Sequence, residues 1–289
     1  MAVTPPVVLT IAGFDPSSGA GITADIKTIA AHECYGVSCV TALTVQSTLG
    51  VRRVVGVDPG IIAETLRELV ADVAVEAVHI GMLGNAPVAE VVADFLTQAQ
   101  LPHIVLDPIL RSSSGADLLD AAGTRLLLER LLPLAELITP NLDEASVLTG
   151  MAVTNLDQMR KAAARLHSLG AANVVVTGGD IDKGEKATDL LTFTTARGVE
   201  EEVFKADRQR SKSTHGTGCA FSTALACHLA HGRGIPEAVL LAKAYVSAAI
   251  AHAHPLGHGV GPLHHLFRLG QQRRPITIVS EGEPAHSRN

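Results

Sequence analysis

The chain has 289 residues, 47% hydrophobic and 18% charged, with a formal net charge of −6. This apolar content is enough for a large core, in one large α/β domain or in two. Because there is no basic excess, we expect no nucleic-acid partner bound through neutralised phosphates.

The four cysteines, Cys34, Cys39, Cys219 and Cys227, form no CxxC pair and have no zinc-ligand spacing. So few cysteines in a chain of this length indicate a reducing compartment and predict a cytoplasmic protein. The apolar run at 7–12 is too short for a signal peptide or a membrane span, so no membrane association is expected.

Strand and helix signals alternate in chain order. Strands are predicted at 7–12, 37–45, 77–80, 104–106, 137–139 and 173–177, with a hairpin at 187–195 and 202–205. Helices are predicted at 21–31, after the Asp58 cap, from the Asn85 cap to 99, from the Thr154 cap to 169, and at 220–230. This β-α-β alternation predicts a mostly parallel sheet with helices on both faces.

Polar and glycine residues follow the predicted strands, where parallel sheets bind their ligands. They are Asp15, Gln46, Gly81, Asp107, Asn141 and Gly178. No repeat or interdomain linker is evident, so residues 1–270 are predicted to form a single domain. The polar stretch at 271–289 is predicted to be a flexible tail.

The segment Ser213–Cys219 leads directly into the apolar helix at 220–230. Gly216 and Gly218 allow a sharp turn, and the first helical turn adds unpaired N–H groups and the positive end of its dipole. This combination predicts an anion hole suited to a phosphoryl group, with the Cys219 thiol at its rim. The structural alternative is a tight loop before a core helix, with Cys219 as a small hydrophobe.

Other glycine patterns are weaker. Residues 19–24 fit G-x-G-x-x-A, but no acidic residue follows at the end of the next strand, as a dinucleotide site requires. Gly179 and Gly184 have P-loop spacing, but Glu185 stands where that loop needs a lysine.

Asp107, Asn141 and Glu144 lie at or just beyond neighbouring predicted strand ends, where carboxylates can hold Mg²⁺ directly or through water. The alternative is that Asn141 or Asp143 caps the following helix, which still leaves Glu144 for the metal. Lys243 lies in the apolar stretch 238–250, where it either snorkels to the surface or reaches a phosphate.

Histidines allow two further hypotheses. Cys219 paired with His215 would suggest a cysteine hydrolase, but a pair i, i+4 across a glycine turn lacks a dependable geometry, and no Gly-rich nucleophile elbow follows a strand. A histidine-rich tract can bind a transition metal, although no spacing here matches a zinc motif, so a solvated helix end and loop is favoured. The tract comprises His252, His254, His258, His264 and His265.

Several blocks of this sequence, taken together, resemble the hydroxymethylpyrimidine/phosphomethylpyrimidine kinases of the ribokinase-like superfamily. The matching residues are 11–22 with Ala24, Asp25 and Lys27; Tyr35, Gly36, Thr41, Ala42, Thr44, Gln46 and 48–51; Gly81, Met82 and Leu83; Asp107 and Pro108; 139–141 with Glu144 and Ala145; 214–219; and 243–246. The blocks span about residues 7–268 in order. The resemblance implies a ribokinase-like three-layer α/β/α fold with a mostly parallel central sheet.

The resemblance also implies an activity: ATP- and Mg²⁺-dependent phosphorylation of 4-amino-5-hydroxymethyl-2-methylpyrimidine and then of its monophosphate. It places the pyrimidine against Gln46, Met82 and the backbone around Gly13 and Ala20, with Asp25 on the phosphate side. It assigns Asp107 and Glu144 to the metal and the triphosphate, Gly216, Gly218 and Lys243 to phosphate charge, and Asn141, Thr177, Gly178 and Thr214, with Asp107, to the nucleotide.

Cys219 stands where sugar kinases of the superfamily carry an aspartate base. A thiol at a helix N-terminus has a lowered pKa, so Cys219 is expected to act as a weak base near neutrality. The second substrate, already a phosphate, needs almost no base, and positioning with charge neutralisation can carry that step.

Departures from the family pattern lie at the nucleotide end, at Ser113, Thr177 and Asp180. The nearest alternative is a pyridoxal kinase of the same superfamily, and a second is a non-catalytic pyrimidine-binding protein. Gln46 favours the aminopyrimidine, because its amide can accept from a ring amine and donate to a ring nitrogen. A homodimer is compatible with the superfamily.

Overall fold

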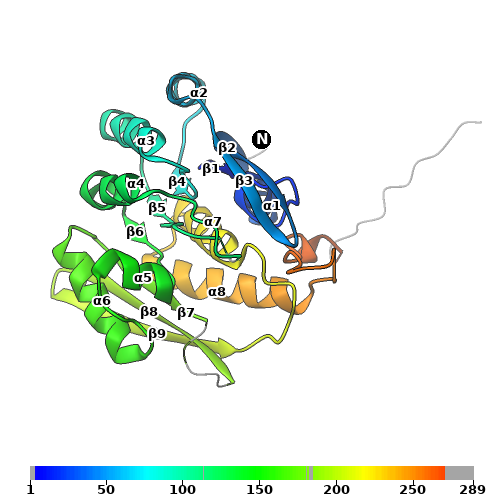
Figure 1. Ribbon diagram of the computed structural model, residues 1–289. Helices are drawn as coiled ribbons and strands as arrows, with labels where there is room; N and C mark the ends of the chain where they lie inside the picture. The colour runs from blue at the N-terminus through cyan, green and yellow to red at the C-terminus, as the bar shows by residue number, and fades with distance from the viewer. Residues whose placement is uncertain (1–3, 113, 180, 182–184, 271–289) are drawn as a thin grey trace, which may run out of the picture.

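The computed structural model describes residues 4–112, 114–179, 181 and 185–270, and one nine-stranded sheet runs through this part of the chain (Figure 1). The strands are β1 (Val7–Phe14), β2 (Tyr35–Ser47), β3 (Gly50–Gly56), β4 (Ala77–Ile80), β5 (Ile104–Leu106), β6 (Leu137–Ile138), β7 (Val174–Gly178), β8 (Lys186–Thr195) and β9 (Gly198–Asp207). The predicted tail at 271–289 lies outside the described residues, as do Ser113 and Asp180.

The strand order is β3-β2-β1-β4-β5-β6-β7-β8-β9. The six strands from β2 to β7 in this order pair in parallel, whereas β3 at one edge and the β8–β9 hairpin at the other pair antiparallel. The apolar run at 7–12 is strand β1, and its buried middle is typical of a parallel strand covered on both faces. The prediction of a mostly parallel sheet is confirmed.

Helices cover both faces of the sheet (Figure 1). They are α1 (Gly21–Ala31), α2 (Pro59–Asp72), α3 (Ala86–Ala99), α4 (Ala121–Leu126), α5 (Leu142–Thr149), α6 (Leu156–Ser168), α7 (Thr217–Ala230) and α8 (Ile235–Ala251), with short helical segments at Leu127–Leu131, Leu132–Leu134 and Phe267–Gly270. Residues of α2, α3, α5 and α6 join one buried apolar cluster, and those of α1, α7 and α8 join a second. The fold is therefore the three-layer α/β/α arrangement that was predicted.

Capping residues set several helix boundaries as predicted. The Asp58 carboxylate accepts from the first N–H groups of α2, and Asn85 accepts from Val88 N at the start of α3. One boundary differs: Asn155 caps α6, while the Thr154 hydroxyl donates to the Gln158 side chain. The predicted cap, Thr154, is therefore one residue too early. Threonine and asparagine are both good N-caps, so the sequence alone did not separate the two positions.

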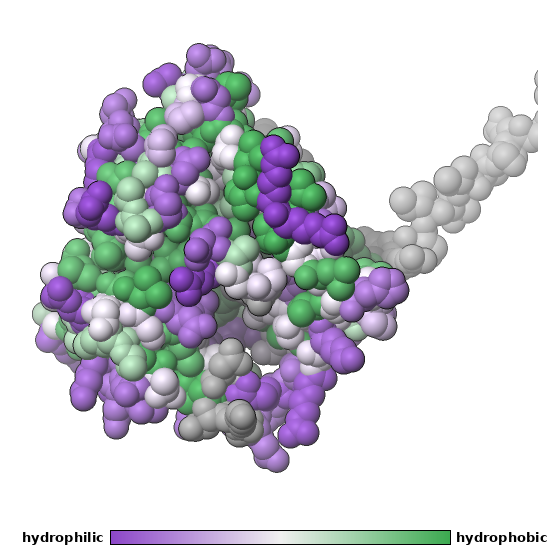
Figure 2. Space-filling view, viewed as in Figure 1, coloured by the Kyte–Doolittle hydropathy of each residue, from purple (hydrophilic) through white to green (hydrophobic). Residues whose placement is uncertain are grey.

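Strand β3 was not predicted, and with the end of β2 it forms an antiparallel ribbon at the sheet edge. Apolar side chains are visible over this region among polar ones (Figure 2), and Leu43, Val45, Leu49 and Val55 are exposed. No helix in the described part of the chain is long and apolar enough to cross a membrane.

Candidate active site

A cavity of about 760 Å³ lies beyond the carboxyl ends of the parallel strands. It brings together most of the site residues expected from the sequence: Gly13, Ala20, Gln46, Met82, Asp107, Asn141, Glu144, Thr177, Thr214, Gly216, Gly218 and Cys219. Three expected residues, Asp25, Gly178 and Lys243, are not among those that line it. Segments as far apart in the sequence as Gly13 and Cys219 thus converge on one volume.

Two glycine loops form one wall of the cavity by packing backbone against backbone. Gly21 (φ +57°) lies against the Gly13 carbonyl, and Gly216 (φ +83°) lies against the Gly19 carbonyl, so neither position leaves room for a Cβ. A Cβ at Gly19 would collide with the His215 ring. The G-x-G-x-x-A pattern therefore serves loop packing.

The predicted anion hole is the start of α7. Gly216 is the N-cap, and Thr217 N–H donates back to the Thr214 carbonyl at 3.3 Å. Gly218 and Cys219 follow in the first turn, where an N–H has no carbonyl four residues back within the helix. A Cβ on Gly218 would lie 3.9 Å from Asp107 Oδ2, so these N–H groups and that carboxylate border the same space.

Asp15 organises the substrate loop after β1. Its carboxylate accepts from Ser17 N, Ser17 Oγ, Gly19 N and Ala20 N at 2.7–3.2 Å, and His215 Nε2 lies 2.8 Å from Oδ2. Burial alone would raise the pKa of Asp15, but the hydrogen bonds from His215, Ser17 and Ala20 lower it to about 2. This carboxylate is fully committed to protein donors.

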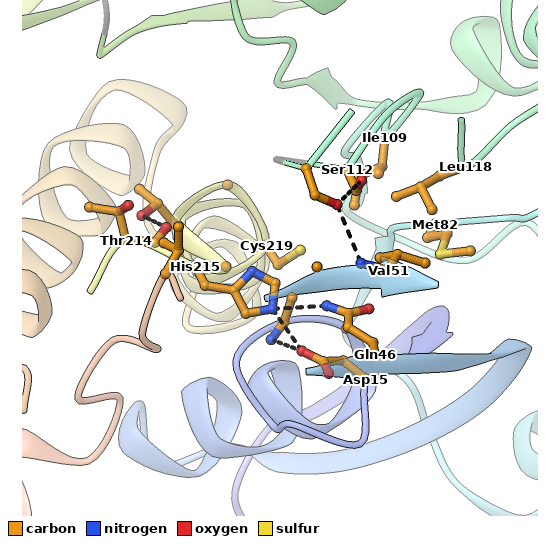
Figure 3. Close-up of a pocket in the computed structure, with 18 of the residues that line it drawn as sticks. Asp15, Gln46, Val51, Met82, Ile109, Ser112, Leu118, Thr214, His215 and Cys219 are labelled. Atoms are coloured by element: carbon orange, nitrogen blue, oxygen red, sulfur yellow. Dashed lines mark hydrogen bonds and ion pairs between the residues drawn. The ribbon is translucent and has the colours of Figure 1, made fainter. Parts of the chain in front are cut away.

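Gln46 and Asp15 both point toward the His215 ring, whereas Met82 lies beside Leu118 (Figure 3). Gln46 Nε2 is 3.0 Å from His215 Nε2, and Thr44 Oγ1 is 3.2 Å from Gln46 Oε1. Met82 is buried and packs with its sulfur beside Gly13. A flat ring can be held here between an apolar thioether and an amide.

The other end of the cavity carries two buried carboxylates. Asp107 Oδ2 has no hydrogen-bond partner, and burial raises the pKa of Asp107 to about 7. Glu144 accepts from Asn141 N at 2.9 Å in a capping box, so Asn141 is the cap and Glu144 its partner. Burial and the nearby Asp107 raise the pKa of Glu144 to about 8.

Asp25 does not line the cavity but lies buried beneath its wall. It is fully buried and accepts from the Thr10 hydroxyl at 2.7 Å and the Thr223 hydroxyl at 2.9 Å. His79 Nδ1 is 3.4 Å from its carboxylate. Burial alone would lower the pKa of His79, but the Asp25 charge raises it. The expected place of Asp25 on the phosphate side is therefore corrected to a buried support between β1, β4 and α7.

The expected basicity of Cys219 is wrong. The residue lies at the helix N-terminus as predicted, but burial and the nearby Asp107 and Asp25 raise the pKa of its thiol well above the usual value. His215 does not activate it, since its Nε2 contacts Asp15 and Gln46. The thiol is neutral near pH 7 and serves as a small wall of the cavity.

Lys243 is also placed differently from the expectation. Its ammonium donates to Asp189 Oδ2 at 2.6 Å, and both side chains are buried. Asp189 Oδ1 accepts from Gly178 N at 3.1 Å, so Gly178 belongs to this buried group behind the cavity. The basic side chains that do line the cavity are Arg111 and Lys212.

Sequence reasoning missed Asp15, Thr44 and His215 as a connected group. Asp15 was noted as a polar residue at a strand end, His215 as a partner for the thiol, and all three as members of the matching blocks, but no contact among them was predicted. A histidine inside a predicted anion loop was the available signal.

Within the described residues, no group of three or more His, Cys, Asp or Glu side chains is arranged to hold a metal, and His258 of the histidine tract lines the cavity.

Comparison with known proteins identifies the family. Residues 15–264 match the model described as phosphomethylpyrimidine kinase. The chain belongs to this family. A hydroxymethylpyrimidine/phosphomethylpyrimidine kinase from Streptomyces coelicolor is 41% identical over 93% of this chain and 97% of its own length. A thiamine biosynthesis bifunctional protein ThiED from Geobacter sulfurreducens is 43% identical over 90% of this chain, which spans 52% of that longer protein.

Solved structures agree on the ribokinase-like fold of these kinases. An ADP complex of Bacillus subtilis pyridoxal kinase has a TM-score of 0.83 and 36% identity, and covers 92% of this chain and all of the solved chain. A phosphomethylpyrimidine kinase from Clostridium difficile has a TM-score of 0.74 and 35% identity, covering 85% of this chain and 99% of the solved one.

Proposed function

We propose that this kinase transfers the γ-phosphoryl group of ATP to 4-amino-5-hydroxymethyl-2-methylpyrimidine and then to its monophosphate, a pair of steps in thiamine biosynthesis. One observation carries the proposal. A single cavity joins Gln46 and Met82 to the loop at Gly216, which begins α7, and to the carboxylate of Asp107. The family membership and the named relatives support the same substrates.

The pyrimidine ring occupies the Gln46 end. The amide accepts from the exocyclic amine and donates to the adjacent ring nitrogen, while Met82 packs against the ring face. The hydroxymethyl group then extends toward the start of α7. This position sets the attacking oxygen beside the loop that receives the phosphoryl group, and such positioning is the main contribution a kinase makes to its reaction.

The N–H groups of Gly218 and Cys219 stabilise charge on the phosphoryl oxygens during transfer. They are fixed before the reaction, because the Gly216 turn is packed against the Gly19 carbonyl. Lys212 adds positive charge at the cavity wall in place of Lys243, and Arg111 lines the same wall with its guanidinium paired to Asp117 at 2.8 Å. The neutral Cys219 thiol takes no proton, so the substrate hydroxyl loses its proton late, to the phosphoryl oxygens it joins.

Asp107 fits a magnesium site. Its Oδ2 is buried and unpartnered and the residue lines the cavity, whereas Glu144 is partly committed to the Asn141 N–H group. Mg²⁺ usually keeps water and phosphate oxygens and takes only one or two protein carboxylates. Bound there, the ion would neutralise the nucleotide phosphates. Asp107 would hold the ion directly, with Glu144 as the second carboxylate, and Asn141, Thr177 and Thr214, which also line the cavity, would contact the nucleotide.

A pyridoxal kinase is the second candidate, because the fold matches a pyridoxal kinase with a TM-score of 0.83. ADP release with ATP and Mg²⁺ decides between the two, when hydroxymethylpyrimidine, its monophosphate and pyridoxal are compared side by side. Turnover of both pyrimidines is expected. Turnover of pyridoxal alone would reassign the substrate, and binding without turnover would indicate a non-catalytic pyrimidine-binding protein.

Gln46→Met supplies the matched variant. It removes both hydrogen bonds but keeps side-chain volume, so pyrimidine turnover is expected to fall more than pyridoxal turnover. Equal loss on both substrates would contradict the role of Gln46.

The homodimer stays a prediction, which sedimentation of the purified chain would test.

A further inference from the structure

The chain of contacts through Asp15, His215, Gln46 and Thr44 contains a conflict of hydrogen-bond donors. The Asp15 carboxylate lies 2.8 Å from His215 Nε2. Since Asp15 is ionised at neutral pH and can only accept, His215 Nε2 must carry a proton, whether the ring is neutral or charged. The Gln46 amide nitrogen, also a donor, is 3.0 Å from that same Nε2.

A second conflict lies at the other side of the amide. The Thr44 hydroxyl donates to the Phe14 carbonyl at 2.9 Å, and its single proton is then used. Gln46 Oε1, which can only accept, lies 3.2 Å from the same hydroxyl. Two acceptors therefore compete for one proton on this side, while two donors face each other on the His215 side.

A half-turn of the Gln46 amide about its last torsion replaces the donor–donor contact with a donor–acceptor contact and removes the competition at Thr44. Oε1 then shares the single His215 Nε2–H proton with Asp15 Oδ2 in a three-centre hydrogen bond, and the amide NH₂ donates to Thr44 Oγ1, which keeps its own proton on the Phe14 carbonyl. Each lateral contact uses one site of the amide. One lone pair on Oε1 and one N–H remain for a ligand in the cavity.

We propose that Asp15, His215 and Thr44 are positioning residues that fix the polarity of the Gln46 amide, with oxygen toward His215 and nitrogen toward Thr44. The cavity then presents an acceptor on the His215 side and a donor on the Thr44 side. A ring with an exocyclic amine next to a ring nitrogen matches this order in one orientation, with its amine toward His215. The inference rests on the proposed role of Gln46 in binding the ring.

This arrangement makes the anion loop part of substrate selection. His215 immediately precedes Gly216, so the loop that receives the phosphoryl group also sets the amide that orients the ring. A free glutamine amide would accept a ring in either polarity. A fixed amide rejects rings that offer two acceptors or none, because a buried polar group would be left unpaired.

The protonation of His215 tests the proposal without any substrate. Long-range ¹H–¹⁵N correlation on the purified kinase, with the His215 signals assigned by their loss in His215→Phe, reports which ring nitrogen carries hydrogen. A proton on Nε2 from pH 6 to 8 is expected. A neutral ring protonated at Nδ1 alone would overturn the proposal, because Nε2 would then accept a hydrogen bond from the Gln46 amide nitrogen. This result is independent of the substrate assignment.

The kinetic test compares hydroxymethylpyrimidine with its analogue lacking the ring amine. Thr44→Val is expected to lower the preference in kcat/KM for the amine about tenfold, mainly through KM, as expected for one buried hydrogen bond worth about 1.4 kcal/mol. Thr44→Ser should restore it. Retention of the full preference in Thr44→Val, or failure of Thr44→Ser to restore it, would contradict the positioning role. No turnover of either ring by the unaltered kinase would instead contradict the proposed function.

Discussion

Each end of the cavity has a buried aspartate, and the two differ in their hydrogen bonding and in the direction of their pKa shift. Asp15 receives hydrogen bonds from the surrounding loop, and the pKa of its carboxyl is lowered to about 2. Asp107 has an oxygen with no partner, and the pKa of its carboxyl is raised to about 7. A carboxylate satisfied by protein builds the site, whereas one left unsatisfied is available to a ligand.

The buried Lys243–Asp189 ion pair is a second case of a carboxylate satisfied by protein groups. Breaking this pair should have the largest effect on stability. Lys243→Met leaves a buried charge without a partner and is expected to lower the free energy of unfolding by about 3–5 kcal/mol. Turnover measured where the variant is folded should change little, because Lys243 does not line the cavity. Urea unfolding and ADP release measure the two effects.

Lys186→Met is the matched control, since Lys186 pairs with Asp207 on the same hairpin in an exposed position. Its cost should be small by comparison, because an exposed ion pair is screened by solvent. A stable Lys243→Met variant without turnover would show that Lys243 acts on phosphate after all.

Gly216→Ala should remove most activity. The new Cβ would meet the Gly19 carbonyl at a positive φ, so the N–H groups that follow would shift. We expect a fall in kcat of about 10²–10³-fold, the usual effect of losing one preorganised donor. Gly218→Ala, which meets only ordinary contacts, should fall less. Equal rates in the two variants would argue against the packed-loop account.

The two aspartates should respond to pH with opposite signs. The lowered pKa of Asp15 gives stability that is present above about pH 4 and is lost as the pH falls toward 2, about 2 kcal/mol in all. The raised pKa of Asp107 gives a penalty that grows as the pH rises from about 4 to 7.

Asp15→Asn should therefore destabilise the protein at pH 7, and Asp107→Asn should stabilise it there but not at pH 4. Urea unfolding at the two pH values measures both. Variants that shift stability in the same direction at pH 7 would remove the contrast between the two ends.

Cys219→Ala should have the smallest effect. Because its thiol is neutral, both phosphorylation rates should remain within a few-fold and the pH–rate profile should keep its shape. A selective loss of the first phosphorylation would restore the role of Cys219 as a base.

Much of the fold could be predicted because its signals are local. The apolar run of β1, the Asp58 and Asn85 caps and the glycine loop before α7 each depend on a few adjacent residues. The charges were harder to predict. Lys243 and Cys219 depend on Asp189, Asp107 and burial, which are set only when distant segments meet. The sequence singled out Lys243 and Cys219 as candidates, but it could not show that Asp189 pairs with the lysine or that Asp107 lies near the thiol.

The most direct test of this contrast is the binding of ADP with and without Mg²⁺, measured by calorimetry on the unaltered kinase and on Asp107→Asn. We predict that Mg²⁺ tightens ADP binding to the unaltered kinase and that Asp107→Asn abolishes this gain while leaving the weak metal-free binding in place. An undiminished effect of Mg²⁺ in Asp107→Asn would contradict the claim that the unsatisfied aspartate receives the metal and nucleotide.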